Sequence, residues 1–415
     1  MTRKLMVLSV DSLFTSDLEA VRQLPGFKEV LSDCVLVKNI ECIYPTLTYP
    51  CHTTMITGQY PMVHGVCHNE RLDPYHNNQK WYWEYESIQV PTIFDYARKA
   101  QLKTAAFSWP VTSKAPIDLC VPEIWNLTKV RNNHAMRHGA SLLGKTLYDH
   151  NQFLLHWKDN KSLDTFSQAC ALEAIRTQKP DVLFMHHALL DHARHVGSIH
   201  SKEVDEALLF HGEFIENLIE AYKDNGDFEN TTFVILGDHG QLNVRRVVSI
   251  NEMLRRRGLI ETDGLGHITH YQAYVQSAGI SGHVLIEDES VRPVVLEVLE
   301  EALNRGYIEK MFTAQECEKM GLNGVKYAIE GAPFVSIGNM VDGDIVQEID
   351  ENDYKNARAT HGHLPQKGDK PMMIIYNSKQ PAKIVEEAKL IDFMPTFLQL
   401  LELNANENLP GKSLL

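Results

Sequence analysis

Three short apolar runs along the chain each end at a polar residue that could carry chemistry. They comprise residues 5–10 before Asp11, residues 181–185 before His186, and residues 232–236 before Gly237-Asp238-His239-Gly240. Continuous apolar runs of this length are typical of strands that are buried on both faces of a parallel sheet. The pattern therefore predicts three buried parallel strands.

Between these runs, the apolar positions follow the spacing of helices. In the clearest case, residues three and four apart fall on one face of a helix: Val204, Ala207, Leu208, His211, Phe214, Ile215, Leu218, Ile219 and Tyr222. Strand and helix alternate, which predicts an α/β fold with a doubly wound, mainly parallel sheet flanked by helices. Such sheets bind ligands beyond the carboxyl ends of their strands, where Asp11, Asp191 and Asp238 would lie.

The pattern changes between His239 and His361. Short strands are predicted at residues 272–275, 283–286 and 308–313, and a helix is predicted at residues 291–305. This order of elements is typical of a small α+β insertion.

A strand at residues 372–376 and a helix at about residues 390–403 then return to the main pattern. We therefore predict one main α/β domain, residues 1–244 and 356–415, interrupted by an α+β cap at residues 245–355.

Composition and charge narrow the possible partners. The 415 residues are 44% apolar and 23% charged, which is ordinary for a globular protein. The net charge of -14 argues against binding to nucleic acid polymers or to anionic membranes, because both require clustered Lys and Arg. Any nucleotide that this protein binds is therefore expected to be a small one, held locally.

The seven cysteines have no paired short spacing. The apolar run that ends at Asp11 is too short for a secretory signal, and no later run approaches the length of a membrane span. These features predict a cytoplasmic protein with free cysteines. The oligomeric state is left open.

Asp191 and His195 lie four residues apart, a spacing that brings both side chains to one face of a helical turn, as a metal site needs. A solvated surface pair is the ordinary alternative for such spacing. The nearby His186, His187 and His192 are interpreted as supporting or surface groups.

Asp238 and His239 stand at the end of a buried strand, where an unpaired charge costs several kcal/mol unless a metal or a partner receives it. A buried salt bridge is the alternative explanation. Asp11 ends the first strand in the same way, and His361 lies in Thr360-His361-Gly362-His363 after the insertion. Each of these also has an ordinary explanation as a polar strand end or a loop histidine.

Residues 44–54 form a segment rich in threonine and proline. It contains Thr46, Thr48, Thr53 and Thr54. One explanation is a turn in which at least one of these hydroxyls caps the next helix.

Together these segments resemble the alkaline phosphatase superfamily, and within it the nucleotide pyrophosphatase/phosphodiesterase branch, over nearly the whole chain. The strongest match is Pro45-Thr46-Leu47-Thr48-Tyr49-Pro50-Cys51-His52, which is similar to the nucleophile motif of that branch. Residues 392–396 and 409–414 also resemble the C-terminal pattern of the superfamily. The resemblance implies an alkaline phosphatase-like fold and a two-metal hydrolase of phosphodiester or pyrophosphate bonds.

The resemblance also implies roles for particular residues. Thr48 would be the nucleophile and pass through a phosphothreonine intermediate, and Asn69 would hold a phosphoryl oxygen. One divalent metal would be bound by Asp191, His195 and His361, and the other by Asp11, Thr48, Asp238 and His239. The donors are imidazole nitrogens and oxygens without thiolate, which suits zinc and tolerates manganese or iron.

Three residues depart from the pattern of the branch: Cys51, Arg194 and Gln241 replace the usual asparagine, glycine and methionine. We expect these positions to flank the substrate pocket. Trp81, Tyr82, Trp83 and Tyr85 offer either a stacking surface for the substrate or ordinary core packing.

Two other functions are compatible with this sequence. The first is a phosphomonoesterase, phosphonate hydrolase or mutase of the same superfamily, with the same metals and a different pocket. The second is a non-catalytic metal-binding relative that has kept the fold.

Overall fold

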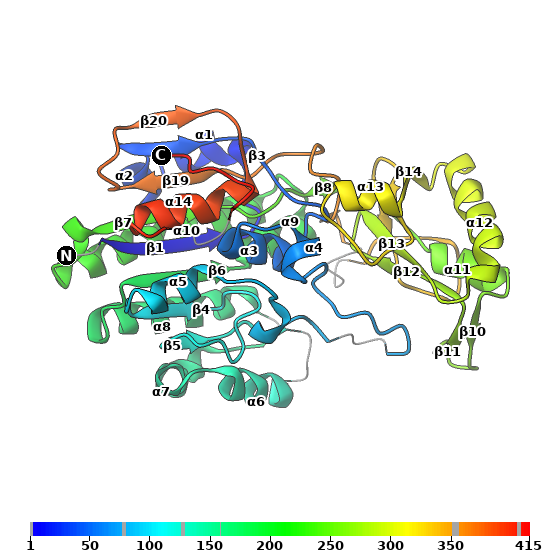
Figure 1. Cartoon of the computed structure of the whole chain (residues 1–415), viewed down its shortest axis with the longest axis horizontal. Helices are drawn as coiled ribbons and strands as arrows, with labels where there is room; N and C mark the ends of the chain where they lie inside the picture. Colours follow the sequence, from blue (N-terminus) through cyan, green and yellow to red (C-terminus); the bar gives the residue numbers. More distant parts are fainter. Residues whose placement is uncertain (1–2, 77–79, 126–128, 158, 351–356, 405–407) are drawn as a thin grey trace.

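Three central strands form the middle of an eight-stranded sheet (Figure 1). The structure is a computed structural model that describes residues 3–76, 80–125, 129–157, 159–350, 357–404 and 408–415. These strands are β1 (Lys4–Val10), β6 (Val182–His187) and β7 (Thr231–Leu236). β1 pairs in parallel with both of the others. The three predicted buried strands are therefore confirmed, and their carboxyl ends share one edge of the sheet.

The other strands complete a mixed sheet in the order β20-β2-β19-β7-β1-β6-β4-β5. They are β2 (Cys34–Val37), β4 (Thr104–Phe107), β5 (Leu119–Val121), β19 (Met373–Tyr376) and β20 (Lys383–Val385). Only β19 runs antiparallel to its neighbours, β2 and β7. The sheet is mainly parallel, as the alternation of elements predicts.

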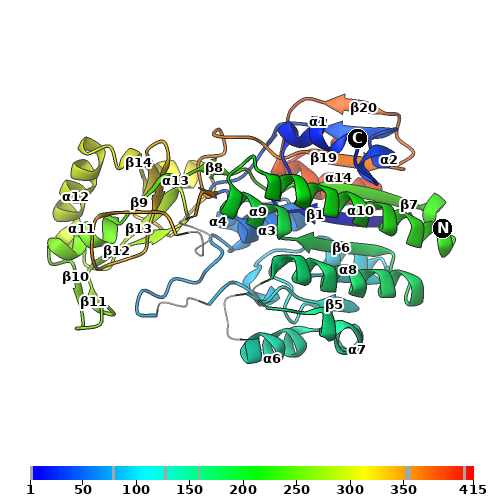
Figure 2. The same ribbon diagram turned by 180° about the vertical axis from the view of Figure 1, so that it is seen from behind.

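Helices cover both faces of this sheet (Figures 1 and 2). One face carries α8 (Asn160–Thr177), α9 (Leu189–Gly197) and α10 (Lys202–Asp224), and the other carries α3 (Thr48–Thr57), α5 (Ile93–Lys99) and α14 (Phe393–Leu400). Successive residues of β6 contribute to different cores, because side chains alternate along a strand. Met185 belongs to the core beneath α8 and α10, and Phe184 to the core beneath α3 and α14.

Shorter elements fill the margins of the main domain. They include α1 (Leu18–Val21), α2 (Phe27–Val30), α4 (Pro61–His64), α6 (Lys129–Gly139), α7 (Leu142–Asn151), β3 (Ile40–Glu41) and β21 (Ala388–Lys389). The predicted helix at residues 390–403 is a short 3-10 turn, Leu390–Asp392, that continues into α14. The Asp392 carboxylate accepts a hydrogen bond from Lys412 N at 2.9 Å, which holds the last residues against α14.

The insertion forms a separate α+β unit beside the main sheet (Figure 1). Its antiparallel sheet has the order β12-β13-β15-β14 and packs against helices. The strands are β12 (Ala273–Ser277), β13 (Ser281–Ile286), β14 (Ile308–Thr313) and β15 (Tyr327–Gly331), and the helices are α11 (Ile250–Arg256), α12 (Arg292–Asn304) and α13 (Ala314–Lys319). The sequence prediction contains every one of these strands except β15.

The chain enters and leaves this cap through two adjacent segments. β8 (Leu242–Asn243) leads out of the main domain, β18 (Ala359–Thr360) leads back, and the two pair antiparallel. The predicted cap boundary at residues 355 and 356 lies outside the described residues, and the domain limits stay a prediction. Small strands near the junction are β9 (Arg246–Val248), β10 (Ile260–Thr262), β11 (Ile268–Tyr271), β16 (Val335–Ile337) and β17 (Val346–Gln347).

All seven cysteines lie within the described residues, and none of them forms a disulfide there. Among the helices of the described segments, none combines the length and apolar character needed to cross a bilayer.

We expect Leu218→Ala to lower the free energy of unfolding by about 2–5 kcal/mol, because the replaced side chain is fully buried beneath α10 and leaves a cavity. Leu209→Ala, on the same helix but 40% exposed, should change it by less than about 0.5 kcal/mol. Urea denaturation of the two variants provides the comparison. Equal losses would contradict the placement of α10 against the sheet.

Candidate active site

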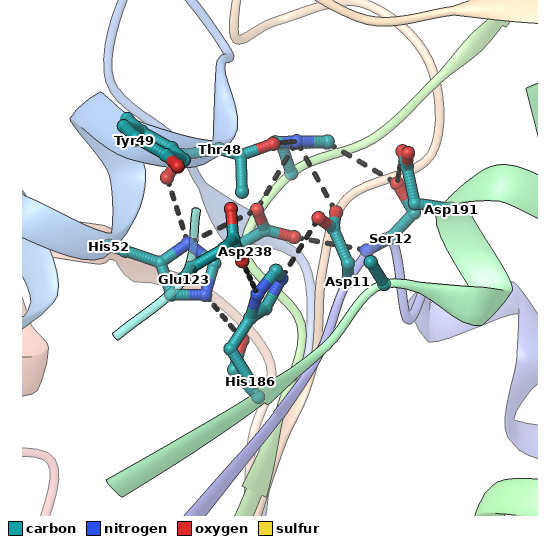
Figure 3. A network of polar contacts seen from close by, with 12 residues as sticks. Asp11, Ser12, Thr48, Tyr49, His52, Glu123, His186, Asp191 and Asp238 are labelled. Atoms are coloured by element: carbon teal, nitrogen blue, oxygen red, sulfur yellow. Dashed lines mark hydrogen bonds and ion pairs between the residues drawn. The ribbon is translucent and has the colours of Figure 1, made fainter. Parts of the chain in front are cut away.

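Asp11 directly follows β1 and is buried where the three central strands end. Its Oδ2 lies 3.1 Å from His186 Nε2, and its Oδ1 lies 3.4 Å from His239 Nε2. His186 in turn contacts Glu123 Oε2 through Nδ1 at 2.7 Å. A buried chain of carboxylate, imidazole and carboxylate therefore orients Asp11 (Figure 3).

Ser12, the next residue, connects the carboxylates to each other. Its backbone N donates to Asp238 Oδ1 at 3.0 Å, and its hydroxyl donates to Asp191 Oδ1 at 3.0 Å. The same hydroxyl lies 3.3 Å from His239 Nδ1. Because the hydroxyl proton points to Asp191, the oxygen accepts the Nδ1 proton of His239, and Nε2 of that ring is left with its lone pair.

The lone pair of His239 Nε2 points into a ring of oxygens. Asp238 Oδ2 lies at 3.2 Å and Thr48 Oγ1 lies at 3.1 Å. Thr48 can donate its proton to this nitrogen, whereas the carboxylates cannot.

The first turns of α9 bring Asp191 and His195 to one face, as their spacing predicts, and His195 is buried rather than solvated. His195 Nδ1 donates to the Ala359 carbonyl at 2.7 Å. Its Nε2 lies 3.0 Å from Asp191 Oδ2. A proton or a metal cation must lie between these two atoms, because both present lone pairs.

His361 follows β18 and completes the group of imidazoles. Its ring centroid is 4.3 Å from that of His239 and 5.3 Å from that of His195. Gly362 N donates to Thr46 O at 2.9 Å, so the threonine segment supports this loop. Gly362 has a φ of +82°, and a Cβ there would stand 1.7 Å from the Ala278 carbonyl of the cap, which explains the glycine.

Thr48 is the first residue of α3, and its hydroxyl faces the cluster (Figure 3). Tyr49 N donates to Asn69 Oδ1 at 2.9 Å, so the amide nitrogen of Asn69 is directed away from Tyr49 N. Thr48 and Asn69 line the same cavity. Thr46 faces elsewhere, because its hydroxyl donates to the His363 carbonyl at 3.0 Å.

The expectation that a threonine caps this helix is wrong. The N-cap of α3 is Leu47, and no side chain caps it. Thr53 and Thr57 bond to carbonyls one turn back, at 2.8 and 2.7 Å, and Thr54 contacts His64 Nε2 at 3.0 Å. The hydroxyl of Thr48 is therefore available for another role.

The cluster concentrates negative charge away from water. Burial, with the charges of Asp238 and Asp191, raises the pKa of Asp11 well above its usual range. Burial would also raise the pKa of Asp191, but the imidazole of His195 outweighs it and holds that pKa well below normal. Burial lowers the pKa of His361 in turn, so that its ring is neutral and suited to bind a metal.

The residues present fit divalent cations. Two groups of three side chains have donor atoms within 4.8 Å of one another: Asp11, Asp238 and His239, and Asp191, His239 and His361. Asp11 Oδ1 and Asp238 Oδ2 are buried and accept no hydrogen bond from the described residues. The structure thus brings all seven expected metal-contacting residues together, with His239 between the groups, while their division into two ligand sets stays a prediction.

A cavity opens beside the cluster and is largely apolar. Besides Thr48, Asn69 and four of the metal-binding residues, its walls are mainly aromatic and aliphatic: Trp81, Ile124, Trp125, Met136, Leu155, Trp157, Leu163 and Phe166. Among the predicted aromatic cluster, Trp81 lines this cavity, whereas Tyr82, Trp83 and Tyr85 do not.

The three departures from the family pattern do not themselves line this cavity. Arg194 is fully buried, forms an ion pair with Asp17 and donates to the Ser12 carbonyl at 3.1 Å. Gln241 donates through Nε2 to the Asp191 carboxylate, and Cys51 lies in the core beneath α3. Arg194 and Gln241 therefore support the expected metal-binding residues from outside the cavity.

The sequence analysis missed Ser12, Glu123 and Gln241 as functional residues. Ser12 and Gln241 lie one and three residues from Asp11 and Asp238, and that proximity was the available signal. Glu123 comes from the loop after β5, and its sequence neighbourhood has no comparable pattern.

An alkaline phosphatase-like sheet with Asp and His gathered at its carboxyl edge defines the class of protein. The chain belongs to the type I phosphodiesterase/nucleotide pyrophosphatase family, whose model matches residues 5–319. Mouse ectonucleotide pyrophosphatase/phosphodiesterase family member 1 is 24% identical over 244 residues, which cover 56% of this chain and 23% of the mouse protein. Rat family member 7 is 31% identical over 120 residues, or 26% of each chain. These matches span about a quarter of the length of the relatives.

Solved structures with the same fold include murine ectonucleotide pyrophosphatase/phosphodiesterase 5, determined as an inactive threonine-to-alanine variant with AMP. It matches 98% of this chain and 96% of its own with a TM-score of 0.68 and 16% identity. The human protein matches 99% and 97% with a TM-score of 0.67 and 15% identity. At these identities the likeness shows the fold.

We expect Asp11→Asn to stabilise the metal-free protein at about pH 8. Folding raises the pKa of the Asp11 carboxyl group, so the folded protein loses stability as the pH rises from about 3.9 through the folded pKa of this group. The neutral amide removes that loss. Zinc at 100 times its dissociation constant should stabilise the parent by about 2.7 kcal/mol and the variant far less.

Thermal unfolding with chelator and with zinc measures both effects, and Asp205→Asn on the exposed face of α10 is the control. A metal-free Asp11→Asn protein less stable than the parent at this pH would show that repulsion does not dominate the site.

Proposed function

We propose that this protein hydrolyses small phosphodiesters or pyrophosphates, with Thr48 as the nucleophile and two divalent cations as cofactors. Zinc is the ion that the nitrogen and oxygen donors suit best, and manganese or iron are tolerated. The observation that carries the proposal is the position of Thr48 Oγ1, 3.1 Å from His239 Nε2 and on the wall of the cavity beside the carboxylates of Asp11, Asp191 and Asp238.

The covalent step takes place at Thr48. Two divalent cations, when bound, would neutralise phosphoryl oxygens and lower the pKa of a hydroxyl that contacts them. The partial positive charge at the start of α3 also favours the ionised hydroxyl. Thr48 Oγ1 attacks phosphorus, the ester or phosphate leaving group departs with its bonding electrons, and water later cleaves the phosphothreonine from the opposite side.

Asn69 orients the phosphoryl group. Its Oδ1 is occupied by Tyr49 N, so its Nδ2 is the end that can donate to a phosphoryl oxygen. Because that hydrogen bond also joins Asn69 to the start of α3, the donor and the nucleophile keep a constant separation.

The cavity favours a diester with an aromatic substituent. The described residues that line it include no Lys or Arg, whereas Glu123 and Asp164 are present. A second negative charge on the phosphoryl group would therefore have no Lys or Arg side chain to meet it. The three tryptophans offer surfaces for an aromatic ring, which is consistent with AMP in the murine relative.

Location in the cytoplasm, expected from the free cysteines and the short first apolar run, stays a prediction. The oligomeric state is open.

We expect Thr48→Ala to reduce turnover by about 10³-fold or more while the metal content stays the same, because the nucleophile is lost and the carboxylates and imidazoles remain. Thr46→Ala is the matched control. It should lose less than about tenfold, since it removes one hydrogen bond to the His363 carbonyl.

Steady-state kinetics with elemental analysis measures both variants, and a chiral thiophosphate diester followed by phosphorus NMR reports the stereochemistry. Two displacements give retention of configuration. Inversion, or a Thr48→Ala protein with most of its activity, would show that water attacks phosphorus directly.

We expect nitrophenyl diesters to be cleaved faster than the matching monoesters, because the described cavity walls provide no Lys or Arg for the second charge of a monoester. The comparison uses kcat/KM for the two esters on one zinc-loaded preparation. A wide preference for the monoester would support the phosphomonoesterase alternative, and no hydrolysis of either by metal-loaded protein would support the non-catalytic one.

A further inference from the structure

A second cluster of metal-ligating side chains lies behind the active site, on the opposite face of β6. His186 faces Asp11, and the adjacent His187 faces α8 and α10, because side chains alternate along the strand. Asp164 from α8 and His211 from α10 meet His187 there. The exposed fractions of Asp164, His187 and His211 are 3%, 0% and 0%, so all three side chains are removed from water.

The three side chains are close enough to share one ion. One donor atom from each lies within 4.8 Å of the other two. The Nδ1 atoms of His187 and His211 are 3.3 Å apart. Two nitrogens bound to one tetrahedral zinc at about 2.0–2.1 Å are separated by about 3.3–3.4 Å, so the observed spacing suits a shared ion.

Hydrogen bonding within the protein leaves this cluster incomplete. The Nε2 atoms of His187 and His211 are buried and have no hydrogen-bond partner among the described residues. A contact between the two Nδ1 atoms accommodates one proton and uses one lone pair. Buried polar atoms are normally satisfied, so the unused Nε2 atoms indicate that a further group, such as a water, is missing beside these rings. An ion bound by the two Nδ1 atoms would replace their mutual hydrogen bond, and each Nε2 would then carry the ring proton.

The charge state of the cluster suits a cation. Burial lowers the pKa of His211 to about 3 and that of His187 well below its usual range, so both rings are neutral. Burial also raises the pKa of Asp164 to about 7. Two neutral imidazoles and a buried carboxylate are donors that zinc prefers, and the ion would compensate the carboxylate charge.

We propose that Asp164, His187 and His211 form a third divalent-cation site, which takes zinc and is separate from the catalytic pair. Asp164 Oδ1 and Oδ2 already accept hydrogen bonds from Ala188 N and Leu189 N, each at 3.0 Å, at the start of α9. The ion therefore joins α8 and α10 to the turn that positions Asp191 and His195. Asp164 also lines the catalytic cavity, which gives the ion a route of entry.

The test is anomalous diffraction at the zinc edge from crystals of the full chain, stripped with chelator and reloaded with zinc alone. We expect a peak between Asp164 and the two histidines, distinct from any peaks at Asp11, Asp191 and Asp238. A map without density at this position under zinc concentrations that fill the catalytic positions would overturn the proposal. Empty catalytic positions with a filled third site would instead contradict the proposed function.

Elemental analysis of variants gives a second measurement. His211→Gln should lose one zinc equivalent per chain relative to the parent, and His138→Gln, which replaces an exposed histidine of α6, should lose none. Unchanged zinc content in a folded His211→Gln protein would show that the pair is only a buried hydrogen-bonded contact. If His211→Gln fails to fold, the diffraction experiment on the parent decides.

Discussion

The repulsion among three closely spaced carboxylates is the constraint on which the rest of this structure depends. Asp11, Asp191 and Asp238 meet at the carboxyl edge of a parallel sheet, where Asp11 and Asp238 are buried and the side chain of Asp191 is 14% exposed. Charge of this kind is tolerated only when cations or protons compensate it. The protein surrounds the carboxylates with imidazoles and leaves two buried carboxylate oxygens without a hydrogen bond from the described residues. Both features are expected if metal ions supply the compensation.

The residues around the carboxylates hold them in place for such ions. Ser12 contacts Asp191 and Asp238, Gln241 donates to Asp191, and His186 joins Asp11 to Glu123. Supporting contacts of this kind orient ligands and fix tautomers in metal sites. The threonine-rich segment, residues 44–54, and the cap contact the loop of His361 from two sides, so that elements far apart in the sequence define one geometry.

Much of this arrangement was predictable because the central strands are continuous apolar runs and their ends carry the metal-binding residues. β15 was missed because Glu330 interrupts its apolar pattern, and in the structure that carboxylate is buried against Lys367 at 2.9 Å. Glu123 was missed because its role arises only when β5 lies near β6. The capping role expected for a threonine was wrong because Leu47 takes the N-cap position of α3. Local patterns thus indicate elements and their ends, whereas tertiary contacts decide which side chains meet.

The central claim is that these carboxylates hold two cations close to Thr48, and electron paramagnetic resonance of the manganese-loaded protein tests it most directly. Two manganese ions about 3.5–4 Å apart are exchange-coupled, as expected for a two-metal hydrolase. The account predicts a coupled spectrum that disappears in Asp238→Asn. A saturated protein that shows only the spectrum of isolated ions would contradict it.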